Sequence, residues 1–148
     1  MRSAKAAPKP WDVIYYRASD GSVPASDFLD ICPPKVHARF LAVIDDVAVA
    51  PPPRFSGGGY WEAMHGSMAG YYEVRQSGPS REQFRLFCIL ENGSPEELGR
   101  RGLPGPAIAL ITGMRKPWMT KFSGRDYRRV LDLGTEHLAQ YPRRIKES

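Results

Sequence analysis

Three short apolar runs, each containing or leading into a cationic residue, constrain the fold of this chain more than any other feature. The runs are Tyr71–Arg75, Phe84–Leu90 and Ile108–Thr112, and the last continues into Gly113–Lys116. Aromatic and β-branched runs of this length, separated by glycine, proline and serine, predict strands of an antiparallel sheet. An arginine inside such a strand is costly to bury unless it is paired or opens on a cleft. Three strands of this kind predict a cationic groove across one face of the sheet.

The residues before these runs predict one strand and two helices. Trp11–Arg17 is predicted to be the first strand, and a short helix is expected at Asp27–Ile31 with Ser26 as its cap. A second helix is predicted to begin near Pro34 and to end before the prolines at 51–53. Its apolar residues recur at three- and four-residue spacing, which gives one face to pack on the sheet: Val36, Phe40, Val43, Ile44 and Val47.

The remaining segments predict one more strand, two loops and a closing helix. Tyr60–His65 is expected to pair as a short strand with Ala69–Arg75, while Gln76–Glu82 and Asn92–Pro106 are expected to be loops. The closing helix is predicted near Arg125–Gln140, where Ser123 can cap it and Pro142 would end it. Its apolar stripe would consist of Tyr127, Val130, Leu131 and Leu138.

This order of elements predicts an α+β fold with a mostly antiparallel sheet of three to five strands. The N-terminal helices would pack on one face of the sheet, and the C-terminal helix would close the same layer. At 148 residues the chain has the length of one domain with a sizeable core. We expect that domain at residues 11–142, between a disordered tail at 1–10 and a basic tail at 143–148.

The net charge of +5 is unevenly placed along the chain. Residues 1–112 carry twelve Lys and Arg against twelve Asp and Glu, whereas residues 113–148 carry nine against four. A positive region beside a cationic sheet face suits a polyanion such as nucleic acid. The alternative is a solvated basic helix that has no such partner.

Several other kinds of site are disfavoured by the sequence. Cys32 and Cys88 are too few for a disulfide framework or a metal set, and the three histidines lack ligand spacing. The glycine run Gly57–Gly59 is not followed by the Gly-Lys-Ser/Thr of a nucleotide-binding loop. No segment approaches the ~18 apolar residues of a membrane span, and the N-terminus lacks the apolar core of a signal peptide. We therefore expect a cytoplasmic protein without a metal, a cofactor or a membrane partner.

Four segments follow one another in a specific order: Trp11–Tyr16, Gly66–Arg75, Phe84–Phe87 and Leu110–Lys116, the last followed by Lys121. This order resembles the phage-derived, HigB-like branch of the RelE/ParE toxin superfamily. Members of that branch show a glycine and an aromatic-Glu-Leu-Arg strand, then a Tyr-Arg strand, then a strand ending in Gly-Phe-x-Lys-Lys with a further lysine nearby. The resemblance covers roughly residues 11–138. The chain departs from the pattern at Met114, at 117–119 and at 122–124.

The resemblance implies a RelE-like toxin of a type II toxin–antitoxin system. Such a protein is a metal-independent endoribonuclease, an mRNA interferase, that cleaves mRNA on the ribosome. Its expected partners are therefore mRNA, the ribosome and a helix-turn-helix antitoxin that neutralises it. No cofactor is expected.

Metal-free RNA cleavage uses the 2′-hydroxyl of the substrate as its nucleophile. The enzyme must take the proton of that hydroxyl, stabilise charge on phosphorus and assist the leaving 5′-oxygen. Guanidinium groups suit the charge stabilisation because they bind phosphate oxygens in pairs and stay charged. Arg75, Arg85 and Arg115 are therefore the catalytic candidates, and the resemblance adds Lys121.

The surroundings of Arg85 leave two interpretations open. Alternation along the strand places Arg85 on one face with Phe87, which could then stack on an RNA base. The alternative to a catalytic role is an ion pair between Arg85 and Glu73 on the neighbouring strand. Tyr72 could stack on a base or supply a hydroxyl, although the same counting favours packing.

The general base is not determined by the sequence. Lys121 or Lys116 could act if neighbouring arginines favour its neutral form, and His65 or Glu73 are alternatives. Lys116 and His65 are also candidates for RNA binding. The second function that the sequence allows is a non-catalytic module, which would bind nucleic acid or protein through the same basic face.

Overall fold

The computed structural model of the chain describes residues 10–51 and 60–147, and the side chains only as far as residue 140. The glycine run at 57–59 and nearly all of the predicted N-terminal tail lie outside the described residues. None of the helices within the described ranges is both long enough and apolar enough to cross a membrane.

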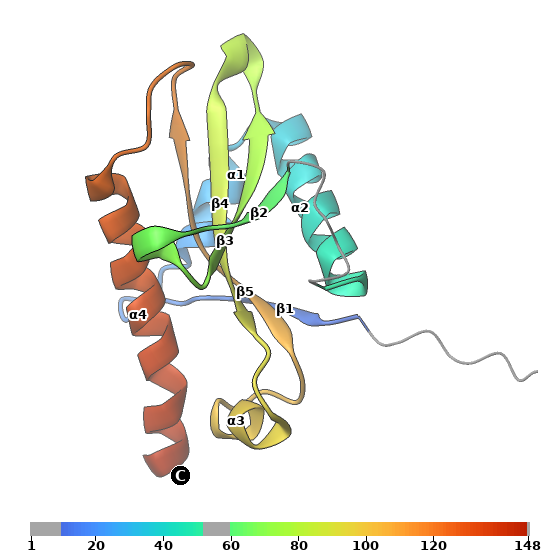
Figure 1. Cartoon of the computed structure of the whole chain (residues 1–148), viewed down its shortest axis with the longest axis vertical. Helices are drawn as coiled ribbons and strands as arrows, with labels where there is room; N and C mark the ends of the chain where they lie inside the picture. The colour runs from blue at the N-terminus through green and yellow to red at the C-terminus, as the bar shows by residue number, and fades with distance from the viewer. Residues whose placement is uncertain (1–9, 52–59, 148) are drawn as a thin grey trace, which may run out of the picture.

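A five-stranded open sheet forms the centre of the structure, and its strand order is β1-β5-β4-β3-β2 (Figure 1). β1 runs parallel to β5, and every other neighbouring pair is antiparallel. The predicted α+β class and the mostly antiparallel sheet are therefore confirmed. The strands are β1 (Asp12–Tyr15), β2 (Trp61–Ala63), β3 (Tyr71–Ser77), β4 (Gln83–Glu91) and β5 (Ala107–Lys116).

Helices cover both faces of this sheet. α1 (Pro24–Ile31) and α2 (Pro34–Val49) lie on one face, and α4 (Gly124–Glu147) lies along the other (Figure 1). Phe84 and Leu86 of β4 pack in the core beside α1 and α2, whereas Phe87 packs in a second core with Val130 of α4. The prediction of helices on one face is correct for α1 and α2 and wrong for α4. The physical reason is that β4 is apolar on both faces, so each face needs a cover.

The helices differ from the sequence-based prediction in three places, two of them helix ends and one an additional helix. α1 begins at Pro24, so Ser26 lies inside the helix; proline suits the first turn because its missing N–H has no partner there. α4 continues past Pro142, since a proline removes one backbone bond without necessarily ending a helix. The long loop contains a short helix, α3 (Pro95–Arg100), which begins with a reciprocal capping pair between Ser94 and Glu97.

A β-bulge in β5 reverses which side chains of that strand face α4. Phe87 is paired with Thr112 and Cys88 with Leu110, so Ile111 is an extra residue in β5. Ile111 packs in the core on the α4 side, and Thr112, the next residue, lies on the same face of the sheet. Two consecutive side chains on one face are the mark of a bulge. Every later side chain of β5 therefore points to the face opposite to the one that strict alternation predicts.

A buried ionic cluster joins the end of β4 to α3 and α4. Arg101 donates from Nε and Nη2 to the two carboxylate oxygens of Glu91, both at 2.6 Å, and from Nη1 to the carbonyl of Leu138. His137 Nε2 lies 2.8 Å from Glu91 Oε2. Burial would raise the pKa of Glu91, but the hydrogen bonds from His137 and Arg101 lower it to about 2. His137 is fully buried, while Leu138 of the predicted apolar stripe is 41% exposed.

The packing of α1 on β5 predicts the effect of a methyl group at Gly113. A Cβ added there would overlap the ring of the buried Phe28. Gly113→Ala should therefore lower the free energy of unfolding by about 1–3 kcal/mol, as overpacking does in a filled core. Gly99→Ala is the matched control, because nothing lies within 4 Å of an added Cβ in α3. Urea denaturation of both variants tests this, and a Gly113→Ala protein as stable as the wild type would contradict the packing.

The Glu91 cluster predicts a pH dependence of stability. The folded-state pKa of Glu91 lies below its ordinary value of 4.5, so the stabilisation is present above that pH and is lost as the pH falls toward 2. This lowering of the pKa corresponds to a contribution on the order of 3 kcal/mol to the free energy of unfolding near neutral pH. Glu91→Gln should therefore unfold more easily than the wild type near neutral pH, and the difference should shrink in acid. Denaturant unfolding of the two proteins across this range measures it; a difference independent of pH would contradict the ionic role of Glu91.

Candidate functional site: a cluster of paired arginines

Two of the predicted arginines lie side by side on the α4 face of the sheet. Arg75 of β3 and Arg85 of β4 are directly opposite each other in the antiparallel register. Each alternates with apolar residues that point to α1 and α2: Val74 for β3, and Phe84 and Leu86 for β4. Like charges at opposed positions repel, so this pair needs carboxylates nearby.

Glu73 holds the two arginines together. Its Oε2 accepts from Arg75 Nη2 at 3.0 Å and from Arg75 Nε at 3.3 Å, and its Oε1 lies 3.5 Å from Arg85 Nε. The Glu73 side chain is only 9% exposed. Glu62 of β2, opposite Glu73 in the register, makes a further ion pair with Arg75 at 3.3 Å and is 44% exposed. The cluster thus contains one enclosed carboxylate and one open carboxylate.

Arg85 is held more tightly than Arg75. Its Nη1 donates to the carbonyl of Phe84 at 3.1 Å, its Nη2 donates to Gln83 Oε1 at 3.3 Å, and its guanidinium lies 5.2 Å from the centre of the Phe122 ring. Its side chain is 18% exposed, against 42% for Arg75. Burial lowers the pKa of Arg85, and this effect outweighs the raising of the pKa by the negative charge of Glu73. For Arg75, the hydrogen bond and charge of Glu73 outweigh burial and raise the pKa.

Tyr127 of α4 borders the arginine cluster. Its ring packs edge-on against Phe87 and in a stacked arrangement with Phe122. Burial and the charge of Glu73 raise the pKa of Tyr127, so the phenol keeps its proton at neutral pH. A surface hollow of about 580 Å³ reaches Tyr127 between η2 (Gly66–Met68) and α4. Its lining is Ser67, Gly124, Arg125, Tyr127, Arg128 and Leu131.

Arg115 does not join this cluster, so the prediction of three arginines in one groove is wrong. In the register Arg115 lies opposite Phe84, on the face of α1 and α2, and its Nε is 3.5 Å from Glu82. Its charge also lowers the pKa of Cys32, although burial raises that pKa to about 11. The bulge at Ile111 is the physical reason, because strict alternation would have placed Arg115 with Arg85.

The predicted lysines and His65 lie around the cluster and not within it. Lys116 is on the α4 side, where its Nζ is 3.1 Å from Asp126 near the start of α4. Lys121 is exposed in the loop that precedes Phe122. His65 is exposed directly before η2. Of the candidates for a general base, Glu73 is therefore the one that contacts both arginines.

The two aromatic residues predicted to contact RNA are packed inside the structure. Phe87 is fully buried beneath α4, so it offers no face to a base. Tyr72 lies on the opposite side of the sheet and stacks on Trp61, with ring centres 4.8 Å apart. The packing alternative for Tyr72 is thus confirmed, and the base-stacking role of Phe87 is wrong because α4 covers that face.

Sequence reasoning missed two members of the cluster, Glu62 and Tyr127. Glu62 carried a signal, since it stands at the centre of the predicted strand Tyr60–His65, which was expected to pair with the strand of Glu73. Tyr127 was assigned to the apolar stripe of the closing helix, and its ring does pack there. Its hydroxyl lies at the border of the arginine cluster only because α4 crosses the sheet face that carries Arg85.

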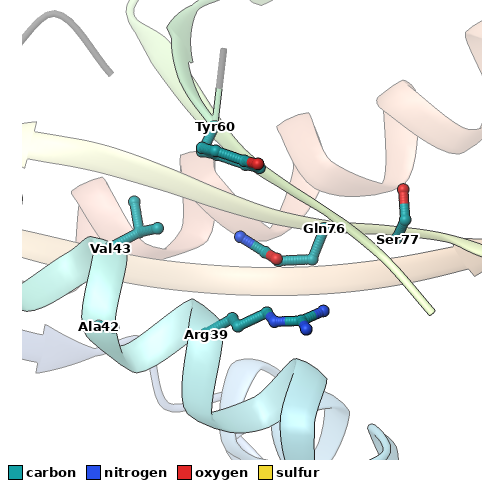
Figure 2. Close-up of a pocket in the computed structure, with 6 residues that line it drawn as sticks. All are labelled: Arg39, Ala42, Val43, Tyr60, Gln76 and Ser77. Atoms are coloured by element: carbon teal, nitrogen blue, oxygen red, sulfur yellow. The ribbon is translucent and has the colours of Figure 1, made fainter. Parts of the chain in front are cut away.

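A second hollow of about 500 Å³ lies between α2 and the end of β3 (Figure 2). Arg39 extends from α2 toward Gln76 and Ser77, and Ala42, Val43 and Tyr60 complete the lining. This lining has one cation and no carboxylate, so it offers no acid–base pair. The arginine cluster is the stronger candidate for chemistry.

The side-chain set of the cluster is not that of a metal centre. Among residues 10–51 and 60–140, no three His, Cys, Asp or Glu side chains are grouped so that they could hold a metal ion. Comparison with known proteins found no matching family model, no similar curated protein and no similar solved structure. The function is therefore inferred from the geometry of the cluster and from the order of the sequence segments.

Proposed function

We propose that this protein is a RelE-like, HigB-type toxin that cleaves mRNA on the ribosome without a metal ion. The observation that carries the proposal is the pair Arg75 and Arg85, fixed opposite each other on neighbouring strands with Glu62, Glu73 and Tyr127 around them. Two guanidiniums on rigid strands suit a phosphate that gains negative charge in the transition state. The α+β fold is consistent with the resemblance in the order of the sequence segments.

Arg75 and Arg85 bind the non-bridging oxygens of the scissile phosphate in this proposal. The 2′-oxygen of the substrate attacks phosphorus, the bond from phosphorus to the 5′-oxygen breaks, and a 2′,3′-cyclic phosphate and a 5′-hydroxyl result. The proton of the 2′-hydroxyl passes to a carboxylate of the cluster. Tyr127, protonated at neutral pH, supplies a proton to the leaving 5′-oxygen.

Glu62 is the carboxylate that suits the role of base. Its side chain is 44% exposed, so a substrate hydroxyl can reach it, whereas that of Glu73 is 9% exposed and ion-paired with both arginines. Glu73 then has a positioning role, because it fixes the separation and direction of the two guanidiniums. Lys121, a catalytic candidate from the sequence, is proposed to bind a phosphate from the neighbouring loop.

The proposed partners follow from charge and from the resemblance. The arginines and lysines of residues 113–148 exceed the carboxylates there by five, and this excess suits the ribosome and its mRNA in the cytoplasm. A helix-turn-helix antitoxin is proposed as the protein partner. Co-expression with neighbouring reading frames, followed by pull-down and a growth assay, tests that assignment.

The second candidate is a non-catalytic module that binds nucleic acid or protein through the same surface. It is favoured by the neutralisation of the cluster, since Glu62 and Glu73 balance the charges of Arg75 and Arg85. Such a module would bind RNA without cutting it. Primer extension on a defined mRNA after induced expression separates the two functions, because only the endoribonuclease creates new 5′ ends.

Arg85→Lys tests catalysis with little change in packing. The lysine keeps the positive charge beside Glu73 but cannot reproduce the two-pronged donor geometry of a guanidinium. We expect the cleavage rate of a ribosome-bound mRNA to fall on the order of 10²-fold, as when one preorganised donor is removed from an active site. The melting temperature should stay close to that of the wild type. A single 2′-deoxy substitution at the cut position is the control that should block cleavage by both proteins.

The two carboxylates of the cluster should respond differently to removal of their charge. Glu62→Gln should reduce the cleavage rate, because an amide cannot take the proton of the 2′-hydroxyl, while the melting temperature is retained. Glu73→Gln should lower the melting temperature as well, because it leaves the half-buried Arg85 without its carboxylate. Rates over a range of pH and thermal melts of both variants measure this. Equal loss of stability in the two variants would contradict the separate roles.

A further inference from the structure

The tip of the β3–β4 hairpin and the loop between β5 and α4 lie at the same end of the sheet (Figure 1). The tip contains the turn η3 (Pro79–Arg81), and the loop covers residues 117–123. The side-chain amide of Gln83 donates to the carbonyls of Pro117 at 3.0 Å and Thr120 at 2.8 Å. These two bonds fasten the loop to the hairpin, so its side chains are presented from a fixed support.

Trp118 is the large aromatic side chain of this surface, and it is 54% exposed. The guanidinium of Arg81 lies over its ring, 4.8 Å from the centroid. One face of the indole is therefore covered by a cation, and the exposed part of the ring is available to another planar group. A tryptophan backed by an arginine is a suitable stacking platform for a nucleic-acid base.

The backbone around this contact is strained. Ser80, Arg81 and Met119 have positive φ angles of 57°, 58° and 67°, which for residues other than glycine costs on the order of 1 kcal/mol each. Arg81 is the residue whose guanidinium lies over the Trp118 ring, and Met119 directly follows Trp118 in the chain. The consecutive positive φ angles of Ser80 and Arg81, with the Glu82 N–H bonded to the carbonyl of Pro79, fit a type I′ hairpin turn, which holds Arg81 at the tip over Trp118.

The charge of this end of the sheet fits a phosphate backbone. Arg115 is paired with Glu82 and Lys116 with Asp126. Within the part of the chain that the structure describes, neither Arg81 nor Lys121 forms an ion pair with a carboxylate. One cation of the hairpin, which lies over the Trp118 ring, and one of the loop are therefore left without a carboxylate partner there.

The same loop leads directly to the arginine cluster. Phe122, one residue after Lys121, lies beneath the guanidinium of Arg85 and stacks with Tyr127. A strand of RNA with one nucleotide on Trp118 could thus continue along Lys121 toward Arg85. This continuity favours single-stranded RNA over a protein as the occupant of the surface.

We propose that Trp118 stacks on a base of the single-stranded RNA substrate, at a position outside the cleavage site. Arg81 supports the opposite face of the indole, and Lys121 contacts a phosphate between that base and Arg85. The assignment of RNA as the ligand rests on the proposed function. Trp118 is a positioning residue in this scheme, since it does not touch the reacting phosphate.

The test is the affinity of the full chain for a short, fluorescein-labelled single-stranded RNA of mixed sequence. Complete 2′-O-methylation prevents cleavage of this probe. Trp118→Ala should weaken binding about 10- to 100-fold, the effect of losing one stacked base, without changing the salt dependence. Trp118→Phe should retain most of the affinity, and Lys121→Ala should reduce the salt slope by about one phosphate contact.

Met119→Ala is the matched control, because Met119 is 77% exposed in the same loop but has no aromatic face. The proposal is overturned if Trp118→Ala binds like the wild type, if Met119→Ala loses as much affinity, or if the wild type binds no RNA. Cleavage of an unmodified, ribosome-bound mRNA by the wild type and by Trp118→Ala is measured in parallel. Stacking without cleavage would contradict the proposed function alone, and cleavage unaffected by Trp118→Ala would contradict this inference alone.

Discussion

Strand β4 is apolar on both faces, and the rest of the structure depends on covering it twice. Phe84, Leu86 and Cys88 lie on one face, and Phe87 and Ile89 lie on the other. Because apolar surface on either side of a central strand must be removed from water, α1 and α2 occupy one face and α4 occupies the other. Arg85 is the charged residue near the start of this run, so it is held where the cover by α4 meets solvent. The site is therefore a consequence of how the sheet is covered, and its position is fixed by rigid elements.

Glu73 determines what the two opposed arginines can do. Without a carboxylate between them, Arg75 and Arg85 would repel across the strand pair, and Arg85 would be half-buried without compensation. Glu73 contacts both and is itself almost enclosed. Glu62 adds a second, open carboxylate from the edge strand. The outcome is a balanced cluster in which one carboxylate positions the cations and the other remains accessible to a ligand.

The α+β class and half of the candidate site could be predicted from the sequence. The apolar patterns indicate strands and helices, and the glycine, proline and serine residues between them indicate where these elements end. The predicted groove correctly brought Arg75 and Arg85 together, and the predicted ion pair correctly joined Arg85 to Glu73. The prediction failed in β5, because the bulge at Ile111 places Arg115 on the other face of the sheet; Gly113, two residues later, is the kind of residue that can mark a bulge. Phe87 was misplaced because nothing local indicates which sheet face a distant helix covers. The helix α3 was missed although Ser94, Pro95 and Glu97 form a recognisable helix start.

From the sequence alone, an ion pair of Arg85 with Glu73 and a catalytic role for Arg85 are alternatives. In the structure, the ion pair is compatible with the proposed catalytic role. An arginine has five N–H donors, and the contacts described for Arg85 use one at each nitrogen: Nε toward Glu73, Nη1 toward the carbonyl of Phe84 and Nη2 toward Gln83. Two donors remain for a phosphate. The contacts that hold the side chain also remove its freedom to rotate, so a substrate would meet a guanidinium already oriented. Preorganised charge of this kind stabilises a transition state without reorganisation during the reaction. A structural ion pair is thus part of what makes Arg85 a suitable catalytic group.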